Sequence, residues 1–228
     1  YVFPLYVYSG GENSLLKSEK HGNFSQEIFH LVKKYSGESA SPEEIFFYIY
    51  AILSSPSYRN RYSQLLKRDF PRVPIAGNSD LFQSIAKFGS TLATIHLLDT
   101  TSLQSSQIQS FGNSYQVNKV GWTPDDGGTV WLDGKGTAKN FQPGTSGFHP
   151  LPEDVWNFRI GGYQVCEKWL KDRGPKKGKP GRTLTDDDIA HYLKILVALT
   201  ETISIMAEID EVIEVHGGWP GAFTSVDC

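Results

Sequence analysis

The chain contains 228 residues, of which 39% are hydrophobic and 21% are charged, and its formal net charge is −3. This length is enough to bury a hydrophobic core, in one large domain or two small subdomains. The negative net charge argues against a simple DNA-coating protein, because phosphate binding needs a concentrated positive surface. Lys, Glu, Asp or His interrupts the longest apolar stretches well before the roughly 18 residues of a membrane span, so no membrane partner is expected.

The cysteines and the start of the chain favour a cytoplasmic piece of a longer polypeptide. Cys166 and Cys228 form neither a disulfide framework nor a CxxC pair, which is typical of a reducing cytoplasm. No basic segment followed by an apolar one opens the chain, so export is not indicated. Residues 1–8 have the pattern of a strand already in progress, and we expect further domains outside this sequence.

The first two helices are predicted from their start signals. Ser25 is a candidate N-cap, with Phe24 and Phe29 placed as a hydrophobic staple, so a helix is expected from there to about residue 35. The run Ser41-Pro42-Glu43-Glu44 has the cap, the N1 proline and the N3 glutamate of a capping box. The helix 43–53 that follows is apolar nearly all round and is expected to be buried.

Two further helices are expected before residue 99. Residues 58–70 read as a helix that Pro71 ends. Apolar residues at helical spacing predict another over 80–98, with Asn78 or Ser79 as its cap.

The second half of the chain changes character and then becomes helical again. Residues 99–150 are rich in Gly, Ser, Thr, Gln and Pro, and short alternating runs at 115–120, 129–132 and 139–142 predict a small antiparallel meander. Helices are expected at 163–172 and at 186–214, and the tail after Gly217 is expected to be loose.

Together these elements predict an α+β protein, mainly helical, with a small antiparallel β-rich section and a long C-terminal helix. We expect three sections: an N-terminal strand with a helical subdomain at 1–98, a β-rich and loop-rich section at 99–150, and a helical part at 151–228.

Two clusters of cations stand out against the negative total. Such clusters can follow a phosphate backbone, although a solvated surface or pairing with nearby acids is the alternative. The candidate DNA-binding residues are Arg59, Arg61, Lys67, Arg68 and Arg72 in the first cluster, and Lys171, Arg173, Lys176, Lys177, Lys179 and Arg182 in the second.

A nuclease motif is the one enzymatic hint in the sequence. Asp125, Asp133 and Lys135 have the spacing of a PD…(D/E)xK site, in which two carboxylates hold Mg²⁺ and a lysine stabilises charge. The surrounding Asp-Asp-Gly-Gly and Asp-Gly sequences equally predict hairpin turns.

No other catalytic or metal-binding pattern is recognised. The six histidines lack HExxH or HxH spacing, and no phosphate-binding glycine motif or GxSxG motif is present. Aromatic residues of the β-rich section could stack on bases, with core packing as the alternative use. These aromatics are Tyr115, Trp122, Trp131, Phe141 and Phe148.

Several blocks, in this order, resemble the C-terminal region of Type ISP restriction–modification enzymes. They are Pro42–Arg59 with its continuation through Tyr62 and Leu66 to Ile75, Leu92–Leu97, Val155–Tyr163 with Lys168–Arg173, and Asp187–Asp210. The resemblance implies a single polypeptide with a nuclease, a helicase-like translocase, an adenine-N6 methyltransferase and a C-terminal target-recognition region. S-adenosylmethionine, ATP and Mg²⁺ are implied for that parent only, and no cofactor is implied for this chain.

The resemblance and the cation clusters together predict a DNA target-recognition module without its own active site. Its expected partners are double-stranded DNA and the methyltransferase and helicase domains of the parent polypeptide. Two alternatives are a structural coupler, which docks the methyltransferase to the motor without reading DNA, and a nuclease built on Asp125, Asp133 and Lys135.

Overall fold

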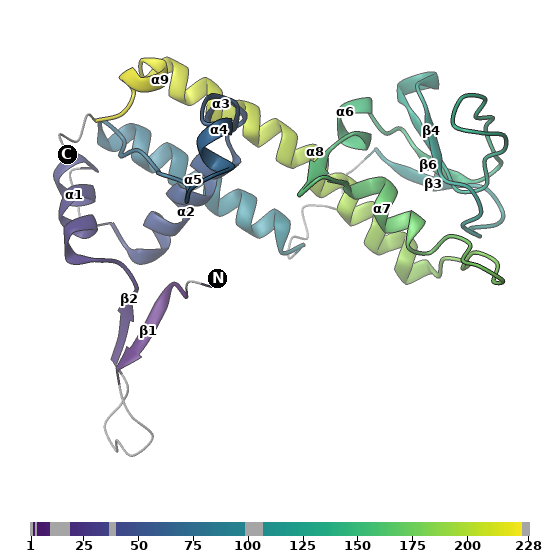
Figure 1. Ribbon diagram of the computed structural model, residues 1–228, viewed down its shortest axis with the longest axis horizontal. Coiled ribbons are helices and arrows are strands. Elements are labelled where there is room, and N and C mark those ends of the chain that lie inside the picture. Colours follow the sequence, from purple (N-terminus) through teal and green to yellow (C-terminus); the bar gives the residue numbers. More distant parts are fainter. Residues whose placement is uncertain (1, 3, 10–18, 37–39, 99–106, 225–228) are drawn as a thin grey trace. The chain divides into compact units, whose positions relative to one another are not determined.

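The computed structural model describes residues 2, 4–9, 19–36, 40–98 and 107–224 (Figure 1). The chain groups into two compact units: unit 1 comprises Tyr1–Leu97 and Ser204–Cys228, and unit 2 comprises Leu98–Ile203. The predicted α+β class, with small antiparallel sheets and a long helix near the C-terminus, is confirmed. The division into three sections at 98 and 150 stays a prediction.

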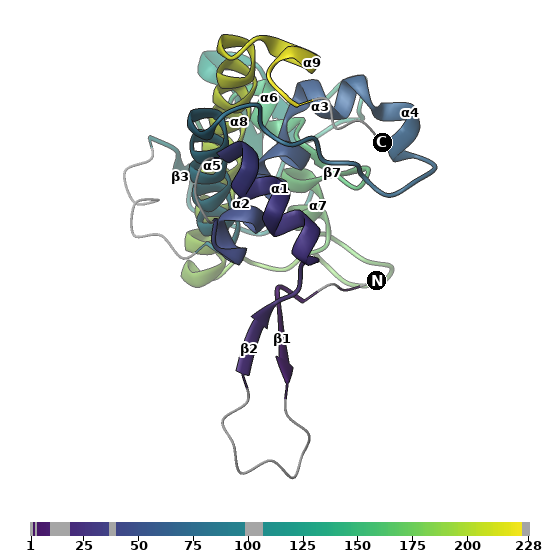
Figure 2. The ribbon, with the colours of Figure 1, turned by 90° about the vertical axis from the view of Figure 1, so that its left-hand side faces the viewer.

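Unit 1 begins with a β-hairpin. Strand β1 (Tyr6–Ser9) pairs with β2 (Glu19–Gly22) in antiparallel register, with Tyr6 opposite Gly22. The hairpin projects from the helices of this unit, as the two views in Figures 1 and 2 agree. At its base the Tyr6 hydroxyl donates to the Glu43 carboxylate, which ties the hairpin to the helical body.

The start signals predicted for the first two helices are confirmed. Helix α1 (Gln26–Ser36) begins where the Ser25 hydroxyl accepts from the Ile28 amide at 3.4 Å, and the Phe24 and Phe29 rings meet edge to face at 5.8 Å. Helix α2 (Pro42–Ser54) has the full capping box: Ser41 Oγ accepts from the Glu44 amide, and the Glu44 carboxylate accepts from the Ser41 amide at 2.7 Å. The caps satisfy amides that have no partner within a helix.

Helices α2 and α5 (Ser79–His96) pack together at the core of unit 1. Asn78 caps α5 by accepting from the Leu81 amide at 2.9 Å, as predicted. A Cβ at Gly89 would lie 1.9 Å from the Phe47 carbonyl oxygen, so only glycine allows the two backbones to approach this closely. Helix α2 is not buried on all sides as expected, because the Phe46 side chain is 39% exposed.

The helix predicted at 58–70 is wrong in its bounds. Helix α3 (Pro56–Arg61) and helix α4 (Ser63–Leu66) replace it, separated by Tyr62, whose φ and ψ of −103° and 16° are not helical. The first of them starts early because Ser55, at the end of α2, also caps it by accepting from the Tyr58 amide at 3.0 Å. Beyond α4, the Asp69 carboxylate accepts from the Phe70 amide at 2.8 Å, a local bond that competes with helix continuation.

Helix α8 (Asp186–Val215) contributes residues to both units. Thr185 caps it: its hydroxyl accepts from the Asp188 amide at 3.2 Å, and the Asp188 carboxylate accepts from the Thr185 amide at 3.1 Å. Among the described residues, α8 alone is long and apolar enough to cross a membrane. Half of its apolar window is buried within the protein.

Residues 218–224 pack against the rest of unit 1, so the expectation of a loose tail after Gly217 is wrong for the part of the tail that the structure describes. Helix α9 (Gly218–Gly221) follows α8 directly, and Ala222 and Phe223 are buried. The Trp219 and Phe223 rings stack at 4.4 Å, and the Thr224 amide donates to the Ile75 carbonyl at 2.9 Å. Apolar packing and backbone pairing therefore fix the tail against unit 1.

Unit 2 contains a four-stranded antiparallel sheet in the order β3-β6-β5-β4. Its strands are β3 (Gln109–Phe111), β4 (Gly121–Thr123), β5 (Thr129–Trp131) and β6 (Gly147–His149). The predicted antiparallel arrangement is right, and the run at 129–132 matches β5. The runs at 115–120 and 139–142 are not strands, because they form only isolated bridges: Gln116 to Thr183, Lys119 to Asp133, and Gln142 to Lys135.

Helices cover the sheet and enclose the core of unit 2. Helix α6 (Glu153–Trp156) is followed by a small hairpin of β7 (Arg159–Ile160) and β8 (Tyr163–Gln164), and then by α7 (Val165–Lys171). The helix predicted at 163–172 therefore begins at residue 165, two residues later than expected. The core gathers side chains from the sheet, α6, α7 and the first half of α8; they include Val130, Phe148, Trp156, Leu170, Tyr192 and Leu196.

Candidate nucleic-acid interface

Three lysines of the second cation cluster lie on a tight hairpin, here called the lysine hairpin (Lys176–Lys179). The Lys176 amide donates to the Lys179 carbonyl at 3.2 Å, and the Lys179 amide donates to the Lys176 carbonyl at 2.8 Å. Gly178, with φ of +79°, closes the turn. Lys176, Lys177 and Lys179 are exposed, and within the described part of the chain none of them forms an ion pair.

The base of the lysine hairpin is fixed to the body of unit 2. The Val117 amide donates to the Arg182 carbonyl at 2.9 Å, and the Gln116 side chain donates to the Gly181 carbonyl at 3.2 Å. A Cβ at Gly181 would lie 1.5 Å from the Val117 carbonyl oxygen, so this contact requires glycine. The lysines are therefore presented on a supported turn.

Arg173 and Arg182 have structural partners. The Asp188 carboxylate lies 2.6 Å from the Arg182 guanidinium and 3.7 Å from Arg173 Nε. The hydrogen bond from the Thr185 amide, helped by the two arginines, lowers the pKa of Asp188. Arg173 also lies 3.5 Å over the centroid of the Trp169 ring and donates to the Trp169 carbonyl, so these arginines hold the loop to the start of α8.

The lysines of α7 form ion pairs along their own helix. Lys171 lies 2.7 Å from the Glu167 carboxylate, and Lys168 lies 2.5 Å from that of Asp172. Both pairs are substantially exposed, and pairs of this kind contribute little to stability. Lys171 can therefore exchange its partner for a phosphate at small cost.

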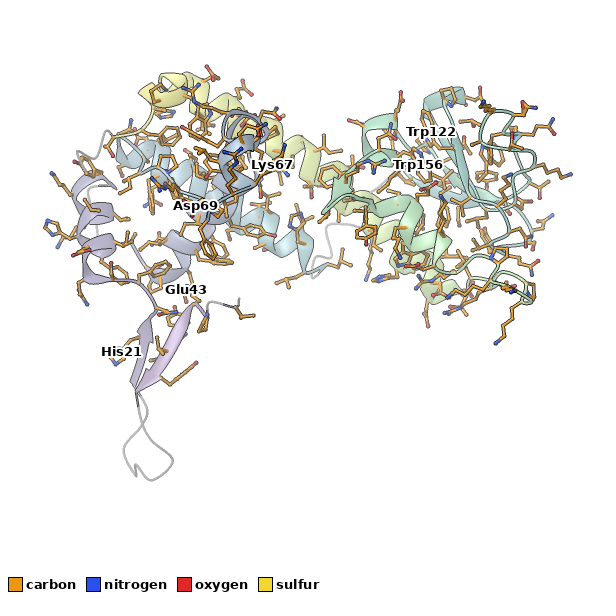
Figure 3. The ribbon with its side chains drawn as sticks, viewed as in Figure 1. His21, Glu43, Lys67, Asp69, Trp122 and Trp156 are labelled. Carbon is orange, nitrogen blue, oxygen red and sulfur yellow. The ribbon has the colours of Figure 1, made fainter. Side chains whose placement is uncertain are left out.

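A recess of about 470 Å³ lies beside the lysine hairpin. Its lining includes Gly174 and Pro175, which lead into the hairpin, and Ala138 and Phe141 of the loop at 134–142. Trp122 and Trp156, labelled in Figure 3, belong to its wall. Two exposed segments of unit 2 thus contribute to the same recess.

The loop at 134–142 brings further cations that the sequence analysis did not assign to DNA. Lys135 and Lys139 are exposed, as are the polar side chains Thr137 and Asn140. The Phe141 ring holds the loop in place by packing on Gly121 and Gly134, where an added Cβ would lie 2.3 and 2.2 Å from it. The sequence signal for these cations was the pair Lys135 and Lys139, four residues apart in a loop that contains Gly and Thr.

The nuclease hypothesis finds no support in the placement of Asp133. Its carboxylate accepts from the Thr145 amide at 3.0 Å, the Thr145 hydroxyl at 2.7 Å and the Ser146 amide at 3.1 Å. Partial burial acts to raise the pKa of Asp133, but these bonds outweigh it and lower the pKa. Over the described ranges, no group of three or more His, Cys, Asp or Glu side chains could hold a metal ion.

The first cation cluster lies in unit 1 and is less uniform than the sequence suggested. Arg59 donates to the Ser54 carbonyl at 2.7 Å and contacts Met206, and burial lowers its pKa. Arg59 is exposed like the others, but these contacts hold its guanidinium against α2 and α8. Arg61, Lys67, Arg68 and Arg72 are exposed, and Arg72 pairs with Asp69 at 3.4 Å.

The Type ISP C-terminal specificity domain model matches residues 1–208. The chain belongs to this family. Two solved structures share the fold of this specificity domain. One is the ATP-dependent Type ISP restriction–modification enzyme LlaBIII bound to DNA, at 20% identity and a TM-score of 0.56 over 92% of this chain. The other is the DrdV–DNA complex, at 21% identity and a TM-score of 0.62 over 90% of this chain.

The specificity domain spans only 13% of the LlaBIII chain and 21% of the DrdV chain. A comparison with curated proteins found no match. The family recognised from the sequence blocks is confirmed.

Proposed function

We propose that this specificity domain binds duplex DNA and supplies sequence specificity to the methyltransferase and nuclease of a longer, intracellular polypeptide. In this proposal it has no catalytic centre of its own. One observation carries it: in a chain of net charge −3, three lysines without ion pairs among the described residues stand on a fixed turn beside a recess. Supporting it, the two solved structures of the same fold contain DNA.

The lysine hairpin would contact phosphates and set the position of the duplex. Ammonium groups on a short turn can follow a phosphate backbone, which carries no sequence information itself. Lys135 and Lys139, in the loop at 134–142, would contact the backbone at a second place. Lys171 would join them, since its ion pair with Glu167 is exposed and weak.

Sequence would be read by polar side chains on the loops that flank the recess. Asn118 lines the recess and Asn140 lies in the loop at 134–142, and both are exposed. An asparagine amide can bond both N6 and N7 of adenine in the major groove, and such a pair discriminates between bases by about 1–3 kcal/mol. Asn118 and Asn140 are therefore the proposed base-reading residues.

Duplex binding by matched variants tests the phosphate contacts. Replacing Lys176, Lys177 and Lys179 with Ala should reduce the slope of log affinity against log salt by roughly 2–3, since each phosphate contact contributes about 0.9. At 0.1 M salt, relative to 1 M, this corresponds to a loss of roughly a hundredfold to a thousandfold. The matched control replaces Lys33, Lys34 and Lys87, which are exposed on the helices of unit 1 and change the net charge equally.

The control should bind DNA much more tightly than the hairpin variant. Equal affinities and slopes for the two variants would remove the lysine hairpin from the interface. The double variant Asn118→Ala with Asn140→Ala should leave the salt slope unchanged and reduce discrimination between sequences.

A further inference from the structure

A second recess, in unit 1, has a different chemistry from the first. It encloses about 490 Å³ beside the segment that joins α4 to α5. Its lining is mainly apolar and aromatic, and includes Tyr58, Tyr62, Leu65, Phe70, Val73 and Ile75. We call it the apolar pocket.

The apolar pocket is held open by hydrogen bonds to its irregular wall. The Tyr58 hydroxyl donates to the Arg72 carbonyl at 2.9 Å, and the Tyr48 hydroxyl donates to the Pro74 carbonyl at 2.8 Å. The next residue, Ile75, accepts from the Thr224 amide at 2.9 Å. Three anchors within four residues fix a segment that has no regular secondary structure, so the pocket is formed before any ligand arrives.

Apolar side chains are left exposed at the pocket. Leu65 is 62% exposed and Phe70 is 64% exposed, although both belong to its lining. Apolar surface gathered around a preformed recess is typical of a binding site, whereas single exposed apolar residues are common.

Cations dominate the rim. Arg72 lines the pocket with a side chain that is 90% exposed, and the Arg61 guanidinium lies 6.0 Å from the centroid of the Tyr62 ring. Lys67 is exposed and directly follows a lining residue, and Arg68 directly precedes another. Asp69 is the one acid among the lining residues (Figure 3 labels it with Lys67). The apolar interior and positive rim together select for a ligand that is apolar at its centre and acidic at its edges.

We propose that the apolar pocket docks a segment of the polypeptide that carries this domain, in which a large apolar side chain is flanked by Asp or Glu. The proposal rests on the proposed function in one respect, that the domain acts within a longer chain. Most of each related chain lies outside this domain, which covers 13% of the LlaBIII chain and 21% of the DrdV chain, so a polypeptide of similar length could contain such a segment. Duplex DNA fits less well, since the only apolar groups it offers in the major groove are thymine methyls, which are too small to fill the interior.

The proposal changes the role of the first cation cluster. Arg61, Lys67, Arg68 and Arg72 select an acidic protein segment, and contact with DNA is left to the lysine hairpin of unit 2. Charge complementarity of this kind determines the partner and the orientation of docking more than the affinity.

Site-specific photocrosslinking in the full polypeptide tests the assignment. A benzophenone side chain is placed at residue 65 and, as the matched control, at residue 97, because Leu97 is also an exposed leucine of unit 1 (76%) and lies outside the pocket. We expect residue 65 to crosslink to one acidic, apolar segment of the same polypeptide, at a yield at least about tenfold above that of residue 97. Crosslinks to DNA, to a second copy, to neutral or basic segments, or at the control yield would overturn the proposal.

Charge reversal separates this proposal from the DNA function. With the probe at residue 65, Lys67→Glu combined with Arg72→Glu should reduce the crosslink at least about fivefold, whereas Lys33→Glu with Lys34→Glu should not. The two charge variants should bind duplex DNA equally, because both change the net charge by the same amount and neither replaces a residue of the proposed DNA interface. If the variant with Lys67→Glu and Arg72→Glu crosslinked as well as the unmodified rim, the proposal that the partner segment is acidic would be refuted. A failure of DNA binding in the unmodified protein would refute only the proposed function.

Discussion

The carboxylate of Asp210 joins three parts of unit 1, and its removal gives a sharp test of the fold. Asp210 Oδ1 accepts from the Ser55 hydroxyl at 2.5 Å and the Ser57 hydroxyl at 2.8 Å, and Oδ2 accepts from the Ser57 amide at 2.9 Å. The Trp219 indole donates to the Ser57 hydroxyl at 2.8 Å, which adds α9 to the cluster. The carboxylate therefore joins α8 to the start of α3, and Ser57 links that pair to α9.

The structure sets the size of the expected effect. Asp210→Ala leaves the fully buried Ser55 hydroxyl without its charged acceptor and the Ser57 amide without any acceptor from this cluster. Hydrogen bonds to charged groups contribute about 1.5–3 kcal/mol each, and they are not additive when they share one acceptor. We expect Asp210→Ala to reduce the free energy of unfolding by about 3–5 kcal/mol, and the isosteric Asp210→Asn by about 1–2 kcal/mol.

Urea denaturation followed by circular dichroism at neutral pH measures both variants. Glu211→Ala is the matched control, because the neighbouring glutamate is exposed on the same helix and should change the free energy by less than about 0.5 kcal/mol. A loss below about 1 kcal/mol for Asp210→Ala would refute the reasoning. So would additive effects of Asp210→Ala and Ser57→Ala, because two residues that share hydrogen bonds must be coupled.

Two further predictions concern unit 2. The folded state lowers the pKa of Asp133, so its contribution to stability is complete above the ordinary aspartate value of about 4 and is lost as the pH falls below it. Asp133→Asn should therefore reduce the free energy of unfolding by about 2 kcal/mol at pH 7 and by less at pH 3, and equal losses at both would contradict this. Burial raises the pKa of the Cys166 thiol to about 12, so peptide mapping should find it unlabelled by iodoacetamide at pH 8 until the protein unfolds; rapid labelling in the native state would be inconsistent with the core described here.

The parts of the fold that the sequence could predict are those governed by local chemistry. The capping box at Ser41, the cap at Asn78 and the long helix from Asp186 each depend on residues within four positions of one another. Such signals can be read from the sequence because the capping residues supply acceptors for amides at the helix start that have no partner within the helix.

The errors arose where distant residues decide the structure. Trp219 and Thr224 order the tail through contacts with Ser57 and Ile75, which are about 150 residues away and share no local pattern with them. The hairpin at residues 159–164 was a missed local signal, since Gly161-Gly162 between two short runs is a two-residue turn with positive φ at both positions.

The candidate interface could be predicted only as a region of charge. Counting cations identified the 171–182 segment, but the sequence does not show that Arg173 and Arg182 pair with Asp188 while the lysines of the hairpin have no such partner among the described residues. It also does not show that the loop at 134–142 faces the same recess, because the two loops meet only through the packing of unit 2. Side-chain pairing, and not charge count, decides which cations are available to a ligand.

The most direct test of target recognition is selection from a randomised duplex pool with this chain at several salt concentrations, followed by sequencing of the retained DNA. We predict one enriched motif, with affinity that falls as salt rises, and the same motif retained more weakly by the lysine-hairpin variant. Retention without any enriched sequence at every salt concentration would contradict the assignment of target recognition to this domain.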